Sequence, residues 1–154
     1  MPKQIFISCV SAEFKSLRED LRFYLTRADC EVKVQEEFRQ TEVDTVEKLD
    51  EYIRTCQAVI HLVGQQPGAK ANQQAVRSFL DEVPHFGESL PEELQERLGD
   101  FSDLTYTQWE AFLALHHKVP LFVYRTADAE QAAAQQEHLQ RLAPAVGSVR
   151  WACR

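Results

Sequence analysis

Short apolar runs alternate with amphipathic helical patterns along this chain, and this alternation constrains the fold more than any other feature. The strand-like runs are rich in β-branched and aromatic residues and cover residues 5–10, 31–34, 58–63, 120–124 and 146–151. Continuous apolar runs of this length are typical of strands buried on both faces. Helical periodicity fills the intervals, over residues 14–25, 46–53, 106–117 and 127–142. The pattern predicts right-handed crossovers and a parallel sheet with helices on both faces.

The predicted fold is therefore a flavodoxin-like, three-layer α/β/α arrangement with about five parallel strands in the order 2-1-3-4-5. Residues 69–104 interrupt the alternation with two short helical patterns, near 73–82 and 91–98, and are predicted to be a helical insertion. A length of 154 residues fits a single domain. Because the chain stops directly after the fifth strand pattern, we expect residues 1–154 to be the N-terminal domain of a longer protein.

Composition and charge argue against several classes of protein. The formal net charge of -7 disfavours direct binding of nucleic acid, because the phosphate backbone would be repelled. The four cysteines have no C-x-x-C spacing, so we expect reduced thiols in a cytoplasmic protein, with no metal centre. The sequence has neither a signal-peptide pattern nor an apolar run of the ~20 residues that span a bilayer, so no membrane association is expected.

Familiar catalytic motifs are absent from the sequence, so a candidate site is located from the predicted fold. There is no G-x-G-x-x-G, Walker P-loop, H-E-x-x-H or G-x-S-x-G pattern. In sheets of the predicted order, ligands bind outside the carboxyl ends of strands 1 and 3. His61, within the third strand, is interpreted as a hydrogen-bonded core or strand-end histidine. His116 and His117 end a predicted helix, where a cation complements the helix dipole.

Glu110 lies near that edge, and the residues around it are compatible with two roles, helix capping and catalysis. Thr107-x-x-Glu110 fits a capping box, and so does Thr105-x-x-Gln108, so the residues alone favour Glu110 as a helix cap. The alternative is catalysis, because Glu110 borders the apolar stripe of its helix and Tyr106 lies one turn before it. A carboxylate beside an aromatic ring can stabilise an oxocarbenium-like transition state. It needs no partner acid if the leaving group is a cationic nicotinamide.

Several segments, taken in order, resemble the bacterial TIR-like branch of the Toll/interleukin-1 receptor domain superfamily. They are Ile5-Phe6-Ile7-Ser8, Glu36-Glu37-Phe38, the strand-ending Gly64, Tyr106-Thr107-x-x-Glu110 and Val119-Pro120-Leu121. The resemblance covers the chain apart from residues 69–104. It implies a flavodoxin-like fold and, in enzymatic members, cleavage of NAD⁺ to nicotinamide and ADP-ribose or a cyclised product. NAD⁺ is then a substrate, and no permanently bound cofactor is implied.

The resemblance also assigns site residues. Glu110 matches the catalytic glutamate that contacts the nicotinamide ribose. Tyr106 and Phe38 match aromatic positions. Residues 11–15 lack the arginines that some NAD⁺-cleaving members place near the phosphates, and Arg39 is expected to replace them. The floor of the site would be formed by Ser8, Cys9, Val10 and Ser11, with Gly64 at the end of the third strand.

Three functions follow from this reading. The first is an NAD⁺ glycohydrolase or cyclase that serves as the effector of a bacterial defence or signalling protein, activated when a fused sensor drives self-association. The second is a catalytically silent TIR-type assembly module. The third is an enzyme related to the nucleoside deoxyribosyltransferases, which place a carboxylate similarly on a related sheet. The 69–104 insertion would either cover the cleft as a lid or fill it.

Overall fold

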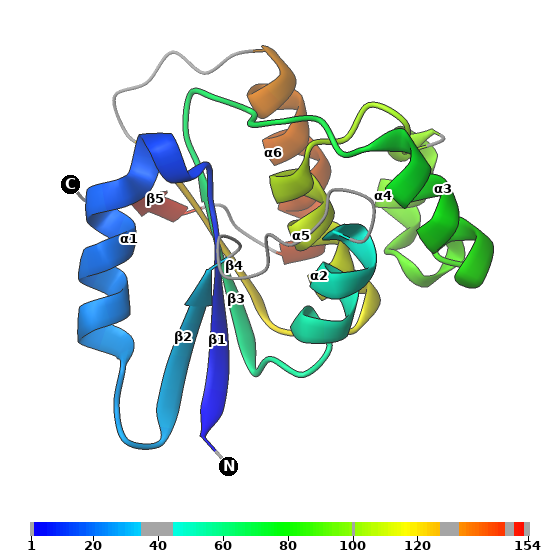
Figure 1. Ribbon diagram of the computed structural model, residues 1–154. Coiled ribbons are helices and arrows are strands. Elements are labelled where there is room, and N and C mark those ends of the chain that lie inside the picture. The colour runs from blue at the N-terminus through cyan, green and yellow to red at the C-terminus, as the bar shows by residue number, and fades with distance from the viewer. Residues whose placement is uncertain (1, 35–44, 100, 127–132, 147–149, 153–154) are drawn as a thin grey trace.

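The structure is a computed structural model and describes residues 2–34, 45–99, 101–126, 133–146 and 150–152. Five parallel strands lie in the order β2-β1-β3-β4-β5 (Figure 1). The strands are β1 Lys3–Ser8, β2 Cys30–Val34, β3 Ala58–Val63, β4 Leu121–Thr126 and the three-residue edge strand β5 Arg150–Ala152. The predicted α/β class, parallel direction and order 2-1-3-4 are confirmed, and the fold is flavodoxin-like.

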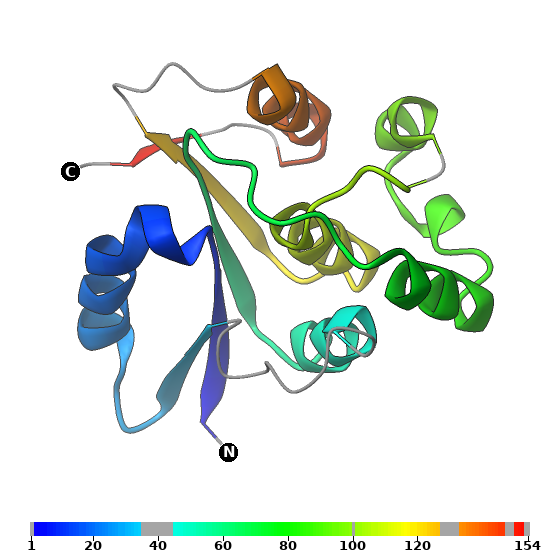
Figure 2. The same ribbon diagram turned by 45° about the horizontal axis from the view of Figure 1, so that its top comes forward.

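The helices divide unequally between the two faces of the sheet, as Figure 2 shows. On one face lies α1 Ser11–Leu25, which packs on Ile7, Val32 and Leu62. The other face carries α2 Thr45–Ile53, α5 Tyr106–His116 and α6 Ala133–Val146. Alternate residues of each strand serve the two faces because side chains alternate along a strand.

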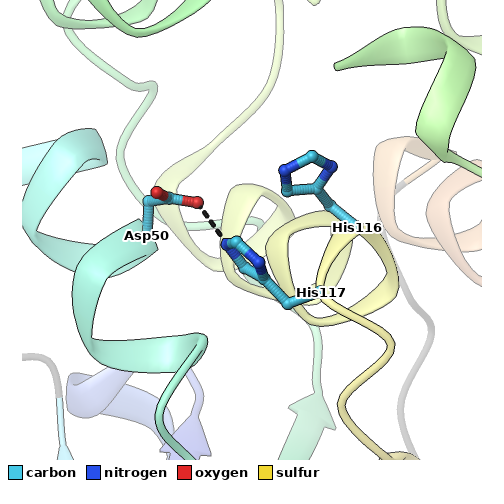
Figure 3. Close-up of side chains that lie close together, drawn as sticks. All are labelled: Asp50, His116 and His117. Carbon is cyan, nitrogen blue, oxygen red and sulfur yellow. Dashed lines mark hydrogen bonds and ion pairs between the residues drawn. The ribbon is translucent and has the colours of Figure 1, made fainter. Parts of the chain in front are cut away.

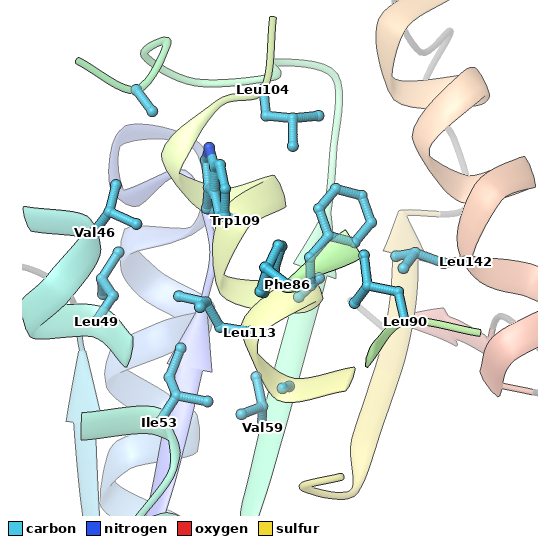
Figure 4. Packing of buried hydrophobic residues seen from close by; sticks show 14 of the residues in the cluster. Val46, Leu49, Ile53, Val59, Phe86, Leu90, Leu104, Trp109, Leu113 and Leu142 are labelled. Atoms are coloured by element: carbon cyan, nitrogen blue, oxygen red, sulfur yellow. The ribbon is translucent and has the colours of Figure 1, made fainter. Parts of the chain in front are cut away.

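The larger core lies between the sheet and α2, α5 and α6 (Figure 4). Helix α5 is its central element, since every residue from Thr107 to Ala114 is buried. Leu113 and Trp109 are fully covered by neighbouring helices. Burying a side chain of this size stabilises the fold by about 2 kcal/mol. Such a helix keeps any polar group on its inner turns away from water.

The 69–104 insertion folds against the outside of α5. It contains the two predicted helices, α3 Gln73–Glu82 and α4 Glu92–Leu98, with a short 3-10 turn η3 Gly87–Ser89 between them. Phe86 stacks on Trp109 at a ring-centroid distance of 5.3 Å. The two ends of the insertion are joined beside the start of α5, where the Ala71 amide donates to the carbonyl of Leu104.

Several predicted boundaries differ from the structure, among them that of the fifth strand, which begins at Arg150 and not at Val146, because Val146 is the last residue of α6. The first strand ends at Ser8, two residues earlier than predicted, because the Val10 carbonyl accepts the first amides of α1, from Glu13 and Phe14. Helix α6 begins at Ala133 in the described residues, and residues 127–132 lie outside them. Across the part of the chain that the structure describes, no helix has the length and apolar character to cross a membrane.

Candidate functional site

The carboxyl ends of β1 and β3 meet the first turns of α5, as predicted for the ligand edge. Ser8 ends β1, Gly64 follows β3, and Glu110 lies in the second turn of α5. Ser8 and Glu110 are both 0% exposed. The structure therefore brings the predicted glutamate to the predicted edge, but it covers that glutamate completely.

The capping role suggested by the residues around Glu110 is wrong. Helix α5 begins with a capping box between Thr105 and Gln108, in which the Gln108 amide donates to Thr105 Oγ1 at 3.3 Å and the Thr105 amide donates to Gln108 Oε1 at 3.0 Å. Only the first turn of a helix has free amides to cap. Glu110 lies past that turn, so its carboxyl group has no helix-start amide to satisfy.

The carboxyl group of Glu110 has one polar neighbour, the Ser8 hydroxyl, which lowers its pKa but does not meet the geometry of an ordinary hydrogen bond. Neither of its oxygens makes a hydrogen bond of ordinary geometry with the described residues. Burial raises the pKa of Glu110 to about 8, and the nearby Ser8 hydroxyl opposes that rise only in part. At neutral pH the group is therefore mostly protonated, since an isolated carboxylate is very costly to bury. Strongly perturbed, unsatisfied groups of this kind occur preferentially at functional sites.

A chain of buried polar side chains runs from Ser8 across the sheet. Ser8 Oγ lies 2.8 Å from His61 Nδ1, and His61 Nε2 lies 2.8 Å from His138 Nε2. Burial lowers the pKa of His61 to about 4 and lowers that of His138 as well, so both rings are neutral. One neutral ring donates and the other accepts, while His138 Nδ1 is buried without a hydrogen-bond partner among the described residues.

These contacts confirm His61 as a hydrogen-bonded core histidine. His138 was not among the residues predicted from the sequence. Its position on one stripe with Gln135, Leu139 and Leu142 of α6 was the available signal, because that stripe faces the sheet.

The loop 64–68 after β3 is attached to three helices. The Glu13 carboxylate of α1 accepts hydrogen bonds from the amides of Gln65 at 2.6 Å and Gln66 at 3.0 Å. Gln135 of α6 donates to the carbonyls of Gly64 at 3.2 Å and Gln66 at 3.0 Å. Thr107 Oγ1 of α5 donates to the carbonyl of Pro67 at 3.2 Å. The loop is therefore fixed to α1, α5 and α6 at the edge that contains Ser8 and Glu110.

The hydrogen bonds from the loop to Glu13 depend on a glycine at position 64. A Cβ atom on residue 64 would lie 2.2 Å from Oε2 of Glu13, well inside contact distance. The glycine thus lets the Glu13 carboxylate approach the backbone and reach the two amides. This contact gives Gly64 a structural role, and its role in an NAD⁺ site stays a prediction.

The other predicted site residues are only partly gathered at this edge. Cys9 is buried under α1, Val10 is half-buried, and Ser11 begins α1. Tyr106 joins the larger core, and its hydroxyl accepts a hydrogen bond of 3.0 Å from the Asn72 amide, so it links α5 to the insertion. Phe38 and Arg39 lie outside the described residues.

Cysteine chemistry receives no support at this site. Cys9, Cys30 and Cys56 form no disulfide, and Cys153 lies outside the described residues. Burial raises the pKa of the Cys56 thiol to about 12, which keeps it protonated and unreactive.

A second polar cluster lies at the far end of α5. Asp50, His116 and His117 bring a carboxylate and two imidazoles together where the strands begin (Figure 3). In the described residues it is the one group of at least three such side chains close enough to share a metal ion.

Comparison with known proteins identifies a family but no individual relative. No curated protein and no solved structure matched the chain. A family model described as a domain of unknown function, DUF4062, matches residues 4–149, nearly the whole sequence. The chain therefore belongs to the DUF4062 family.

Proposed function

We propose that this domain is an NAD⁺ nucleosidase with Glu110 as its catalytic carboxylate. It would release nicotinamide and leave ADP-ribose or a cyclised product. The observation that carries the proposal is the Glu110 carboxyl group, which is fully buried, has no hydrogen-bond partner of ordinary geometry among the described residues, and lies at the carboxyl edge of a flavodoxin-like sheet. Such a group destabilises the fold, and function is the usual reason that one is retained. The resemblance to TIR-like enzymes supplies the substrate class.

The chemistry needs Glu110 as an anion. Cleavage breaks the bond between ribose C1′ and the nicotinamide nitrogen, and the electron pair leaves with nicotinamide, which becomes neutral. The positive charge left on the ribose is stabilised by the carboxylate until water, or a nucleophile within the substrate, attacks C1′. In the closed structure Glu110 is mostly protonated at neutral pH. Catalysis therefore requires an open state in which water or substrate reaches the carboxyl group and its pKa falls.

Loop 64–68 is the element that would open. Its attachment through Glu13 uses two backbone amides, of Gln65 and Gln66, which become free donors when the carboxylate leaves. Consecutive backbone amides of this kind bind anions, so they suit the pyrophosphate of NAD⁺. We propose that the domain rests in the closed state and opens when domains associate through a fused sensor in a bacterial defence or signalling protein. The expected compartment is the cytoplasm.

Nicotinamide release tests this proposal directly. Concentrated chain is incubated with NAD⁺, and nicotinamide is quantified by chromatography for the wild type and for Glu13→Ala, whose loop attachment is weakened. We expect the highest rate from Glu13→Ala, and Glu110→Gln in that background should lower it at least about a hundredfold, as for other groups that stabilise transition-state charge. Glu137→Gln, an exposed glutamate on α6, is the matched control and should retain the rate.

Two results would contradict the proposal that the domain is an NAD⁺ nucleosidase. One is no nicotinamide from either the wild type or Glu13→Ala, and the other is equal release with and without Glu110→Gln. A free deoxynucleoside is assayed in parallel, and its cleavage without loss of NAD⁺ would assign the domain to the deoxyribosyltransferase-like alternative.

The complete burial of Glu110 favours a second candidate, a TIR-type assembly module without activity. The side chain is 0% exposed and the loop beside it is held by Glu13, Thr107 and Gln135. In that case light scattering would detect concentration-dependent self-association, unaffected by Glu110→Gln, while NAD⁺ stays intact.

A further inference from the structure

Three metal-ligating side chains converge at the C-terminal end of α5, remote from Glu110. Asp50 projects from α2, His116 is the last residue of α5, and His117 follows it (Figure 3). Asp50 Oδ1 and His117 Nε2 are 2.6 Å apart, and one ligand atom of each of the three residues lies within 4.8 Å of the others. All three side chains are half-buried, so the cluster is ordered by packing yet open to ions from solvent.

Contacts around His116 leave one ring nitrogen directed at the other two residues. His116 Nδ1 is hydrogen-bonded to Ser89 Oγ in η3. The ring also packs on Phe86, at a centroid distance of 4.9 Å. Nε2 is therefore the nitrogen that faces Asp50 and His117 (Figure 3). Metal-binding histidines typically have this arrangement, in which the second ring nitrogen is held by a hydrogen bond that sets the orientation of the ring.

The electrostatic setting favours a cation. The unpaired carbonyls at the end of a helix carry a partial negative charge of about half an electron, and His116 and His117 lie at that end of α5. Asp50 adds a full negative charge, and the whole chain carries a formal net charge of -7. A divalent ion would also replace the hydrogen bond between Asp50 and His117 with two ligand bonds.

We propose that Asp50, His116 and His117 form a binding site for a divalent transition-metal ion of the Zn²⁺ class. Two imidazoles and one carboxylate are ligands that Zn²⁺ accepts, with a fourth position left for water or another ligand. Ligand atoms around a tetrahedral ion at about 2.0 Å are about 3.3 Å apart. In the structure Asp50 Oδ1 and His117 Nε2 are 2.6 Å apart, and the three ligand atoms lie within 4.8 Å of one another. Side-chain movements of about 1.5 Å or less therefore bring them to the spacing of a tetrahedral site.

The ion would join α2 to the end of α5 and, through Ser89, to the insertion. It lies at the opposite edge of the sheet from the proposed NAD⁺ site, so this proposal does not depend on the enzyme. Its role is to stabilise the packing of α2 on α5, since an ion that binds only the folded state raises the stability of that state.

Calorimetric titration of the purified chain with ZnCl₂ tests the site. We expect one Zn²⁺ per chain, removed by a chelator, and a Co²⁺ complex with the intense visible absorption of a four-coordinate ion. Asp50→Asn keeps an acceptor for His117 but removes the charge, and His116→Gln removes a ligand; each should weaken binding by more than about tenfold. His85→Gln is the matched control, because His85 also lies beside a carboxylate, at 3.3 Å from Glu88, but has an exposed side chain and is outside the cluster.

Thermal unfolding separates binding from folding. With chelator present, we expect all four proteins to unfold at similar temperatures, and Zn²⁺ should raise the midpoint for the wild type and His85→Gln only. If Asp50→Asn fails to fold, Zn²⁺ binding by His116→Gln is compared with that of the wild type. The proposal is overturned if Zn²⁺ does not bind at one per chain, or if His116→Gln binds it as tightly as the wild type.

Discussion

The carboxylate of Glu13 accepts a hydrogen bond of 2.6 Å from the backbone amide of Gln65, which ties the first turn of α1 to the loop after β3. The two residues are 52 positions apart in the sequence. The contact joins α1 to loop 64–68 at the carboxyl edge of the sheet. Its strength can be measured separately from any activity.

Removing the Glu13 carboxylate should destabilise the fold. Glu13→Ala deletes two charge-assisted hydrogen bonds to the loop, each contributing about 1 kcal/mol at a partly exposed site. We expect the urea midpoint to fall by the equivalent of about 2 kcal/mol. Glu19→Ala, on an exposed position of the same helix, should change it by less than about 0.5 kcal/mol. Equal effects in the two variants would show that the loop attachment adds nothing to stability.

Gly64→Ala should act through the same contact. The new Cβ would lie 2.2 Å from Oε2 of Glu13, so the carboxylate must leave the amides of Gln65 and Gln66. We therefore expect Gly64→Ala to lower stability much as Glu13→Ala does. In a double-mutant cycle, Gly64→Ala should cost little once Glu13 is alanine, because neighbouring changes that remove one interaction are not additive. Additive losses would contradict a shared contact.

The buried Glu110 should make stability fall as pH rises. Its pKa is raised from 4.5 to about 8 in the folded state. Between these values the folded chain binds more protons than the unfolded chain. The stability linked to Glu110 is therefore full below pH 4.5 and is lost progressively up to about pH 8, at no more than about 1.4 kcal/mol per pH unit. Glu110→Gln cannot titrate. Its unfolding free energy should fall less than that of the wild type between pH 5 and 8, and parallel curves would exclude the raised pKa.

His61 should have the opposite dependence on pH. Its pKa is lowered from 6.5 to about 4 by burial, so the unfolded chain binds the extra proton between these values. The stability that this ring contributes is present above pH 6.5 and is lost as pH falls towards 4. Proton NMR of the ring should show a neutral imidazole at pH 5.5. A protonated His61 at pH 5.5 would contradict the buried chain from Ser8 to His138.

The sequence predicted the fold well because alternation of apolar runs is a property of the chain itself. Residues 58–63 and 73–82 coincide with β3 and α3, since each has a clear period and strong flanking signals. The start of α5 at Tyr106 was also predicted, but the sequence left its cap residue open. Two overlapping capping boxes are possible there, and Thr105 is the residue that caps the helix. Its backbone pairs with Lys70 of the insertion, a contact that the local sequence pattern does not predict.

The candidate site was predicted in part. Glu110 and Ser8 were placed at one edge because strand order determines which loops meet there. His138 was missed because its partner, His61, is 77 residues away and an isolated histidine in a helix carries no local signal. The second cluster was missed for a similar reason, since His116 and His117 become potential ligands only when α2 brings Asp50 to them.

Sequence alone determined the order of strands and helices, the apolar faces and the insertion, because these depend on periods of a few residues. Tertiary structure decided what the polar residues do. It buried Glu110, paired Glu13 with the loop amides and gathered Asp50, His116 and His117, because burial and hydrogen-bond partners depend on elements that are distant along the chain. The pKa of Glu110 follows from that burial and not from its neighbours in sequence.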